Sequence, residues 1–130
     1  MKNYKEKLKI VNALPEQERF WMVNDTLYNC PEYEVLYSKL IKDVGFCDIH
    51  YPVVCDYPLI LIGIHPHFWH QKIGYNLLLG ALDYAKDNLI KIKYIVDKEN
   101  LPSINLIESF NYSYYREFEY CYEYYFEFNK

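Results

Sequence analysis

The chain has 130 residues, a formal net charge of −4, a hydrophobic fraction of 52% and an aromatic fraction of 19%. This length fits one domain with its own core, and the apolar content excludes an intrinsically disordered chain. The sequence has no basic cluster and no apolar run near the ~20 residues of a membrane span, so we expect neither nucleic-acid binding nor membrane insertion.

The N-terminal sequence MKNYKEKLK lacks the apolar core of a signal peptide. No C-x-x-C pair occurs among the four cysteines, and scattered cysteines of this kind are typical of buried reduced thiols rather than of zinc ligands or disulfides. They are Cys30, Cys47, Cys55 and Cys121. We therefore expect a single domain over residues 1–130, a cytoplasmic location and no bound metal.

Apolar periodicity predicts the elements of the first part of the chain. Residues 8–14 (LKIVNAL) are expected to form a strand, and Pro15 to open a helix that ends near Asn29. Residues 33–41 and 44–53 are predicted to form two further strands joined by the short turn between them.

The central part has the pattern of a β-α-β crossover. Residues 58–64 (PLILIGI) are nearly all apolar, as in a strand that is covered on both faces. A helix is predicted from Tyr75 to Asn88, a strand over 90–96 and a second helix over about 101–110. The predicted fold class is mixed α/β, with a central, mostly antiparallel sheet and a crossover at about 59–96.

The C-terminal stretch 116–128 alternates strictly with a period of two. Its even positions are aromatic apart from Arg116, and its odd positions carry the acids. No Gly, Pro or Asn interrupts residues 112–128, so one long strand is predicted, and the alternative is a tight turn near Tyr120–Cys121 that gives two short strands in a monomer. A long strand would leave an aromatic face uncovered, from which we predict a homodimer through the C-terminal strands.

Two stretches of the crossover and the following helix carry recognisable motifs. The strand ends Ile64-His65-Pro66, and the loop after it reads Trp69-His70-Gln71-Lys72-Ile73-Gly74. Further along, without a gap, come Val96, Asn100, Ser103, Leu106, Ile107, Asn111 and Tyr112. This arrangement resembles the GNAT (Gcn5-related N-acetyltransferase) family, whose motifs are Val/Ile-x-Pro with Arg/Gln-x-x-Gly-x-Gly/Ala, and Val-x-x-x-Asn-x-x-Ala-x-x-Leu-Tyr-x-x-x-Gly-Phe. The resemblance extends from about Leu8 to the C-terminus.

The first motif departs from the family at two places. With the family spacing from Pro66 to Gly74, Trp69 replaces Arg/Gln and Lys72 replaces the first glycine. A register that begins at Gln71 matches two residue types but lies further from the proline, and the unshifted register is preferred. In the second motif, Asn111 replaces a glycine and is expected to have a left-handed conformation at the end of its helix.

The resemblance implies that acetyl-CoA binds along residues 62–75. Its pyrophosphate would lie on free backbone N–H groups of about 71–75 at the start of a helix, with Lys72 as an added cation. The alternative is a plain loop with one solvated lysine. If position 72 needs a positive φ, a lysine there costs roughly 1–2 kcal/mol. The implied cofactor-binding residues are Ile62, Gly63, Ile64, Trp69, His70, Gln71, Lys72, Ile73, Gly74, Tyr75, Asn100 and Ser103.

Gly63 lies inside an otherwise apolar, β-branched strand. Such a glycine often marks a bulge or a close approach of another group. The resemblance implies that residues 62–64 pair with the pantetheine amides and polarise the thioester carbonyl. Packing of a small residue against a helix explains Gly63 equally well.

The candidate catalytic residues differ from those of the family. The family's usual acid is a tyrosine seven residues after the asparagine, where this chain has Ile107. Tyr114, beyond the helix, and His50 or Asp48, on the preceding strand, are the substitutes. For His65 and His67, which flank the corner proline, an ordinary structural role is the simpler interpretation.

The resemblance implies an acetyl-CoA-dependent N-acetyltransferase that moves an acetyl group to a primary amine by direct transfer. The acceptor is expected to be a small molecule, a protein lysine or an N-terminus, and an acidic strand face beside it would favour a cationic amine. The alternative is a catalytically silent GNAT-like module that binds CoA or another protein.

Overall fold

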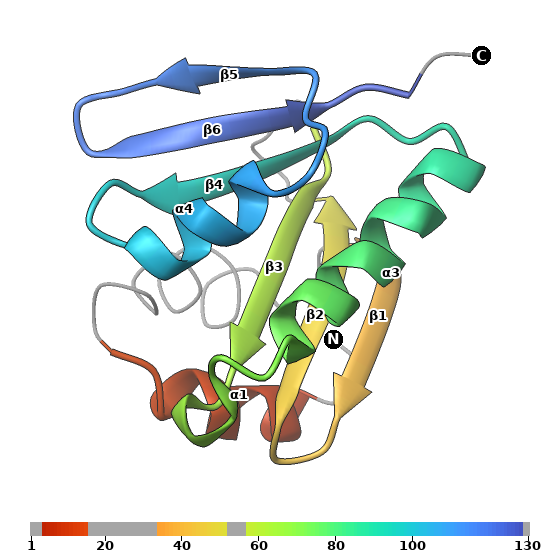
Figure 1. The fold of residues 1–130 in the computed structure, drawn as a ribbon. Coiled ribbons are helices and arrows are strands. Elements are labelled where there is room, and N and C mark those ends of the chain that lie inside the picture. Colours follow the sequence, from red (N-terminus) through yellow and green to blue (C-terminus); the bar gives the residue numbers. More distant parts are fainter. Residues whose placement is uncertain (1–3, 16–33, 52–56, 129–130) are drawn as a thin grey trace.

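One six-stranded sheet organises the protein (Figure 1). The computed structural model describes residues 4–15, 34–51 and 57–128. In chain order the elements are α1 (Tyr4–Asn12), β1 (Glu34–Ile41), β2 (Gly45–Tyr51), β3 (Leu59–Ile64), the 3-10 helix η2 (Pro66–Phe68), α3 (Ile73–Asp87), β4 (Ile92–Asp97), α4 (Leu101–Glu108), β5 (Tyr114–Glu117) and β6 (Cys121–Phe126).

The strands follow the order β1-β2-β3-β4-β6-β5, and every neighbouring pair is antiparallel except β3 and β4. These two parallel strands are paired only at Leu59 and Lys93. Beyond that pair they diverge, and Figure 1 shows β3 and β4 pointing in different directions. The sheet therefore opens in its middle, and this opening positions the candidate site.

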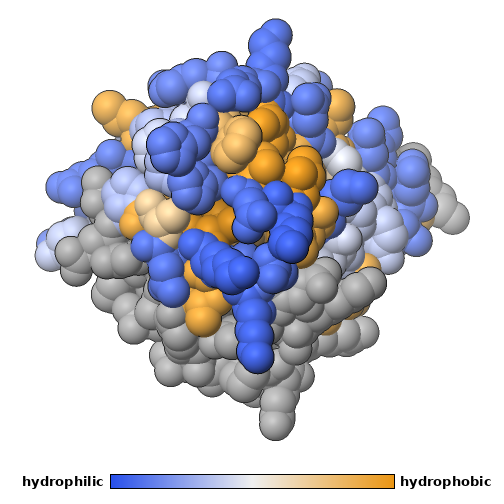
Figure 2. Space-filling view, turned by 90° about the horizontal axis from the view of Figure 1, so that it is seen from below, coloured by the Kyte–Doolittle hydropathy of each residue, from blue (hydrophilic) through white to orange (hydrophobic). Residues whose placement is uncertain are grey.

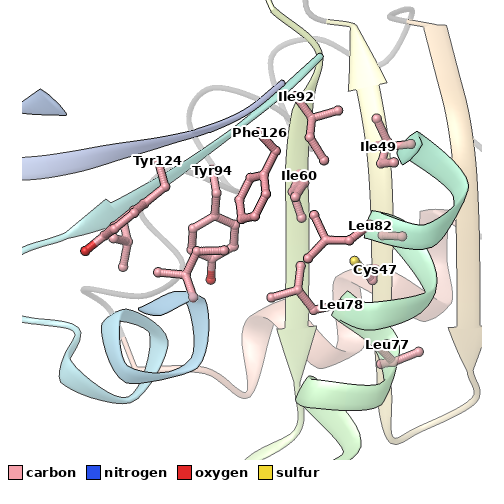
Figure 3. Packing of buried hydrophobic residues seen from close by; sticks show 14 residues of the cluster. Cys47, Ile49, Ile60, Leu77, Leu78, Leu82, Ile92, Tyr94, Tyr124 and Phe126 are labelled. Carbon is pink, nitrogen blue, oxygen red and sulfur yellow. The ribbon is translucent and has the colours of Figure 1, made fainter. Parts of the chain in front are cut away.

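Helices cover the two faces of the sheet. Leu77, Leu78 and Leu82 of α3 pack against β2, β3 and β4 in the larger core, which also contains Tyr94, Tyr124 and Phe126 (Figure 3). On the other face, α1 and the residues after it contribute Ile10, Val11 and Leu14 to a second cluster with Phe46 and Leu61. Because β2 has helices on both faces, residues 45–50 are all buried.

Several predicted elements are confirmed. The strands at 33–41 and 44–53 correspond to β1 and β2, although the end of the second lies outside the described residues. The crossover is confirmed as β3, α3 and β4, and the next helix as α4. The left-handed conformation predicted for Asn111 is wrong: Asn111 is not among the residues with positive φ, because α4 ends earlier, with Ser109 as its C-cap.

The strand predicted over 8–14 is wrong, because this segment lies in and just after helix α1. Lys7, Ile10, Val11 and Leu14 are the buried positions, and their spacing is that of one helix face. A short apolar run does not distinguish a helix from a strand by periodicity alone. The helix predicted from Pro15 to Asn29 lies outside the described residues, apart from Pro15 itself.

The single long strand predicted for the C-terminus is also wrong, and the alternative with two short strands is confirmed. β5 and β6 form a hairpin in which the Phe118 N–H donates to the Cys121 carbonyl oxygen over 2.9 Å. The Tyr120 carbonyl oxygen also accepts from the Lys98 N–H at 3.0 Å, which ties the hairpin turn to the end of β4. This contact is distant in sequence, so no local turn residue signals it.

No helix in the described part of the chain combines the length and the apolar content that crossing a membrane requires.

Candidate functional site

A cavity of about 370 Å³ lies where β3 and β4 diverge. Both strands line it, together with the loop before α3 and the start of α4. Its walls are mostly apolar, with Ile60 and Ile62 from β3 and Val96 from β4 among them. Seen from below Figure 1, the side on which α1 and η2 lie, hydrophobic residues form a patch that hydrophilic residues surround and partly cross (Figure 2). The volume is in the range of small-molecule sites.

The loop before α3 brings backbone donors to this cavity. Lys72 is the N-cap of α3, and no side chain caps the helix. The first helical bond of α3 runs from the Asn76 N–H to the Lys72 carbonyl oxygen at 3.0 Å. The N–H groups of the first turn, up to Tyr75, therefore have no acceptor within the helix and carry its positive end. An anionic group could be held here.

Two residues of this loop have left-handed backbones. His70 has φ 64° and Lys72 has φ 62°. Lys72 stands where the GNAT motif has its first glycine, and its positive φ favours the unshifted register. Gly74 also agrees with that register, since an added Cβ would be 3.6 Å from Ile64 and Leu106 and an alanine would fit.

Trp69 fastens the loop to the end of β3. Its indole N–H donates to the Ile64 carbonyl oxygen at 2.8 Å, and its ring packs against the cluster beside α1. Near it, the His67 N–H donates to His65 Nδ1 and the two imidazole rings stack at 5.1 Å. His65 and His67 therefore stabilise the corner around Pro66.

Gly63 makes room for a buried ring. A Cβ at this position would lie 2.9 Å from Cε1 of Phe46 on β2 and 3.6 Å from Cδ1 of Leu14. The register between β2 and β3 continues without a shift through Gly63, so the glycine marks a close approach and not a bulge. Gly63 also lines the cavity.

His50 lies at the closed end of the cavity, where β3 and β4 are still paired. It pairs with Leu59, the residue at which β3 and β4 still meet, and it lines the cavity although its side chain is fully buried. Burial, and next the charge of Lys7, lower the pKa of His50 to about 4. The imidazole is therefore neutral at physiological pH.

Asp48, two residues before His50, does not line the cavity. It is fully buried under α1, where its carboxylate accepts a hydrogen bond from Lys7 Nζ at 2.6 Å. Burial raises the pKa of Asp48, while the hydrogen bonds and charge of Lys7 and the hydrogen bond of Ser38 oppose the rise. Asp48 is thus engaged in an ion pair.

The other predicted catalytic residue, Tyr114, lies apart from the cavity. It is on β5 at the edge of the sheet, and its ring stacks on Tyr125 with centroids 4.6 Å apart. Ile107 is fully buried in the larger core, so no polar group replaces the family tyrosine at that point.

Eleven of the twelve predicted cofactor-binding residues line the cavity, and Gln71 is the exception. The Gln71 amide instead donates to the His67 carbonyl oxygen at 3.3 Å. Asn100 and Ser103 line the cavity and also form the cap of α4, because Asn100 Oδ1 accepts from the Ser103 N–H. Eleven further lining residues were not predicted as site residues, among them Tyr94 and Leu14, neither of which stands in a motif.

The acidic residues of the C-terminal strands are largely paired. Glu117 contacts Lys98 at 2.8 Å, and Glu123 contacts Lys93 at 3.5 Å. Glu127 accepts a hydrogen bond from the Tyr57 hydroxyl. The two lysines compensate part of the charge of the predicted acidic face. Within the described ranges, no three His, Cys, Asp or Glu side chains gather as a metal site.

Comparison with known proteins identifies the family of this chain and structures that resemble it. The sequence profile of the acetyltransferase (GNAT) family matches residues 14–112. A search of curated proteins found no match. The ribosomal-protein-S18-alanine N-acetyltransferase of Escherichia coli is a similar structure, with a TM-score of 0.59 and 19% identity over 98% of this chain and 86% of that one. The PaiA N-acetyltransferase of Thermoplasma acidophilum, solved with coenzyme A, has a TM-score of 0.60 and 15% identity over 96% and 88%. The chain belongs to the GNAT family of acetyltransferases, enzymes that use acetyl-CoA.

Proposed function

We propose that the protein is an N-acetyltransferase that moves the acetyl group of acetyl-CoA directly to a primary amine. The observation that carries this proposal is one cavity lined both by the uncapped start of α3 and by a neutral histidine. The start of α3 supplies hydrogen-bond donors for a phosphate, and His50 supplies a proton acceptor.

The residues present fit acetyl-CoA. Apolar walls from β3 and β4 suit an extended pantetheine arm, and the unpaired edges of the diverging strands offer backbone groups to its amides. The first-turn N–H groups of α3 and the ammonium of Lys72 supply positive charge for the pyrophosphate. Since Trp69 already donates to the Ile64 carbonyl oxygen, Ile62 and Gly63 are the stronger candidates for pairing.

Direct transfer agrees with the thiols of the described residues. Cys47 and Cys121 are free but do not line the cavity, and burial raises the pKa of both. In the transfer, the amine nitrogen bonds to the carbonyl carbon, the C–S bond breaks and the thiolate takes a proton from water. His50 takes the proton that the nitrogen releases.

The acceptor is proposed to be a primary amine of a small molecule, a protein lysine or an N-terminus. The E. coli structure is that of an enzyme named for an alanine of a ribosomal protein. Peptides with a free N-terminal amine therefore belong in the first panel of acceptors.

A catalytically silent module is the second candidate. It is favoured by the fully buried Ile107 at the position of the family tyrosine. This candidate predicts CoA binding without transfer.

We also propose that the protein forms a homodimer through its C-terminal strands. β5 is an edge strand, and three aromatic residues on and after it are exposed: Tyr115 (52%), Phe118 (46%) and Tyr120 (73%). A second copy of the chain that pairs with this edge would bury its exposed aromatic residues. The cytoplasmic location stays a prediction.

Calorimetry with CoA and acetyl-CoA, followed by thiol release with an amine panel, tests the proposed activity. The panel holds N-terminal amines of peptides, lysine peptides, polyamines and aminoglycosides.

We expect His50→Gln to lower kcat about 100-fold and His67→Gln, at the exposed corner, to leave it unchanged. A loss with Tyr114→Phe would instead favour Tyr114. No binding at millimolar CoA by a folded protein would contradict the proposal, and binding without transfer would favour the silent module.

A further inference from the structure

A buried ion pair lies beside the candidate site. Lys7 of α1 and Asp48 of β2 have fully buried side chains, and Lys7 Nζ lies 2.6 Å from Asp48 Oδ2. The same ammonium donates to Ser38 Oγ of β1 at 2.9 Å and lies 5.9 Å from the centroid of the Phe46 ring. Lys7 of α1 thus contacts residues of both β1 and β2.

This pair shares a face of the sheet with His50. Asp48 and His50 alternate on β2, so both point toward the face that α1 covers. The described charged groups facing His50 are Lys7 from α1 and Asp48 on its own strand. Its strand neighbours are apolar, with Val35 opposite on β1 and Leu59 opposite on β3. The charge of Lys7 adds to burial in disfavouring the imidazolium form.

Within the described part of the chain, the ion pair leaves one of its buried oxygen atoms unsatisfied. Asp48 Oδ1 is buried and has no hydrogen-bond partner among the described residues. Buried ion pairs often stabilise a fold no better than apolar residues of the same volume. A role for the charge itself explains why a lysine is held there.

We propose that Lys7 is a positioning residue for acetyl transfer, whose buried ammonium, held by Asp48 and Ser38, keeps His50 neutral at the closed end of the cavity. This inference rests on the proposed function, in which His50 accepts the proton released by the acceptor amine. It makes α1 part of the site, although Lys7 does not line the cavity.

NMR titration of His50 in the full chain tests this role without requiring acetyl transfer. The wild-type midpoint is expected at a pH of about 4. Lys7→Met should raise it by roughly one pH unit, because the nearby cation is gone, and Lys7→Arg should keep it close to the wild-type value. Asp48→Asn should lower it further, because the ammonium then has no compensating charge. Lys98→Met, which removes an exposed ion pair with Glu117, is the matched control and should have no effect.

Removing one partner of a buried pair can unfold the chain, so a double variant accompanies the single ones. Lys7→Met with Asp48→Leu leaves an apolar site, and the His50 midpoint should again rise above that of the wild type. An unchanged midpoint in the folded double variant would overturn the proposal. In active enzyme, the acid limb of kcat/KM should shift with the midpoint. If the wild type binds CoA without transferring acetyl groups, the proposed function fails, while the titration still decides whether Lys7 sets the charge of His50.

Discussion

Lys72 illustrates how one residue can depart from a family motif and still adopt the backbone that the motif requires. Its φ of 62° is the conformation that glycine adopts freely. A lysine keeps the N–H at this point and adds a cation at the entrance of the cavity, at a cost in backbone strain. His70, two residues earlier, carries a similar strain with φ 64°. Strain of this kind gathers at functional sites.

Lys72→Gly should raise the free energy of unfolding by about 1 kcal/mol, because the left-handed conformation no longer strains a side chain. Urea denaturation measures this change. Lys86→Gly, inside the last turn of α3, is the matched control and should lower the free energy of unfolding by about 1 kcal/mol. Equal destabilisation by both substitutions would contradict the strain at position 72. The same Lys72→Gly protein should bind CoA more weakly, since it lacks the cation.

At the scale of elements, β3 connects the two cores and the cavity. Its residues alternate between the larger core, through Ile60, and the cluster beside α1, through Leu61. Gly63 belongs to the second face, where the Phe46 ring takes the space of a side chain. The end of β3 is therefore packed against β2 on one side and open toward β4 on the other.

Gly63→Ala should destabilise the protein by about 1–3 kcal/mol, because its Cβ would meet the fully buried Phe46 ring. Phe46→Leu in the same chain should recover part of that loss, which a double-mutant cycle in urea would show. Gly74→Ala is the control: its Cβ has ordinary contacts, and it should be neutral or stabilising. Additive effects of Gly63→Ala and Phe46→Leu would argue against this packing.

At the scale of the whole molecule, the C-terminal hairpin forms one end of the sheet and exposes its aromatic residues beside an unpaired edge. Tyr124 and Phe126 of β6 face the core, as the alternation predicts. In β5, Tyr115, an odd position, shares the face of Tyr124, because these two residues are partners across the hairpin. Tyr115 is nevertheless 52% exposed, since β5 is the edge strand.

Light scattering at tens of micromolar should give a mass twice the 15.8 kDa of the chain. Replacing Tyr115, Phe118 and Tyr120 together by serine should give a monomer, because the exposed aromatic surface is lost. Leu101→Ser, an equally exposed apolar residue at the start of α4, is the control and should leave the dimer intact. A wild-type monomer under these conditions would contradict the dimer.

The class of fold and about half of the cavity lining could be predicted from the sequence. Strong apolar runs predict β2 and β3, and the spacing from Pro66 to Gly74 predicts the loop before α3. These features are local: a strand, a turn and a helix start each depend on residues close together in the chain. Together with the resemblance to the GNAT family, they allowed the cofactor-binding residues to be proposed before any contact was known.

Which polar groups lie close together depends on the tertiary structure. The apolar pattern of residues 8–14 does not distinguish a strand from a helix. In the structure the segment is helical and packs against Phe46 and Leu61. The turn of the C-terminal hairpin is held by Lys98, which is distant in sequence. The burial of Lys7 beside Asp48 and His50, and the distance of Tyr114 from the cavity, follow from the order of strands in the sheet. Burial and the nearby charge of Lys7 set the protonation state of His50, and the residues next to His50 in the sequence predict neither of them.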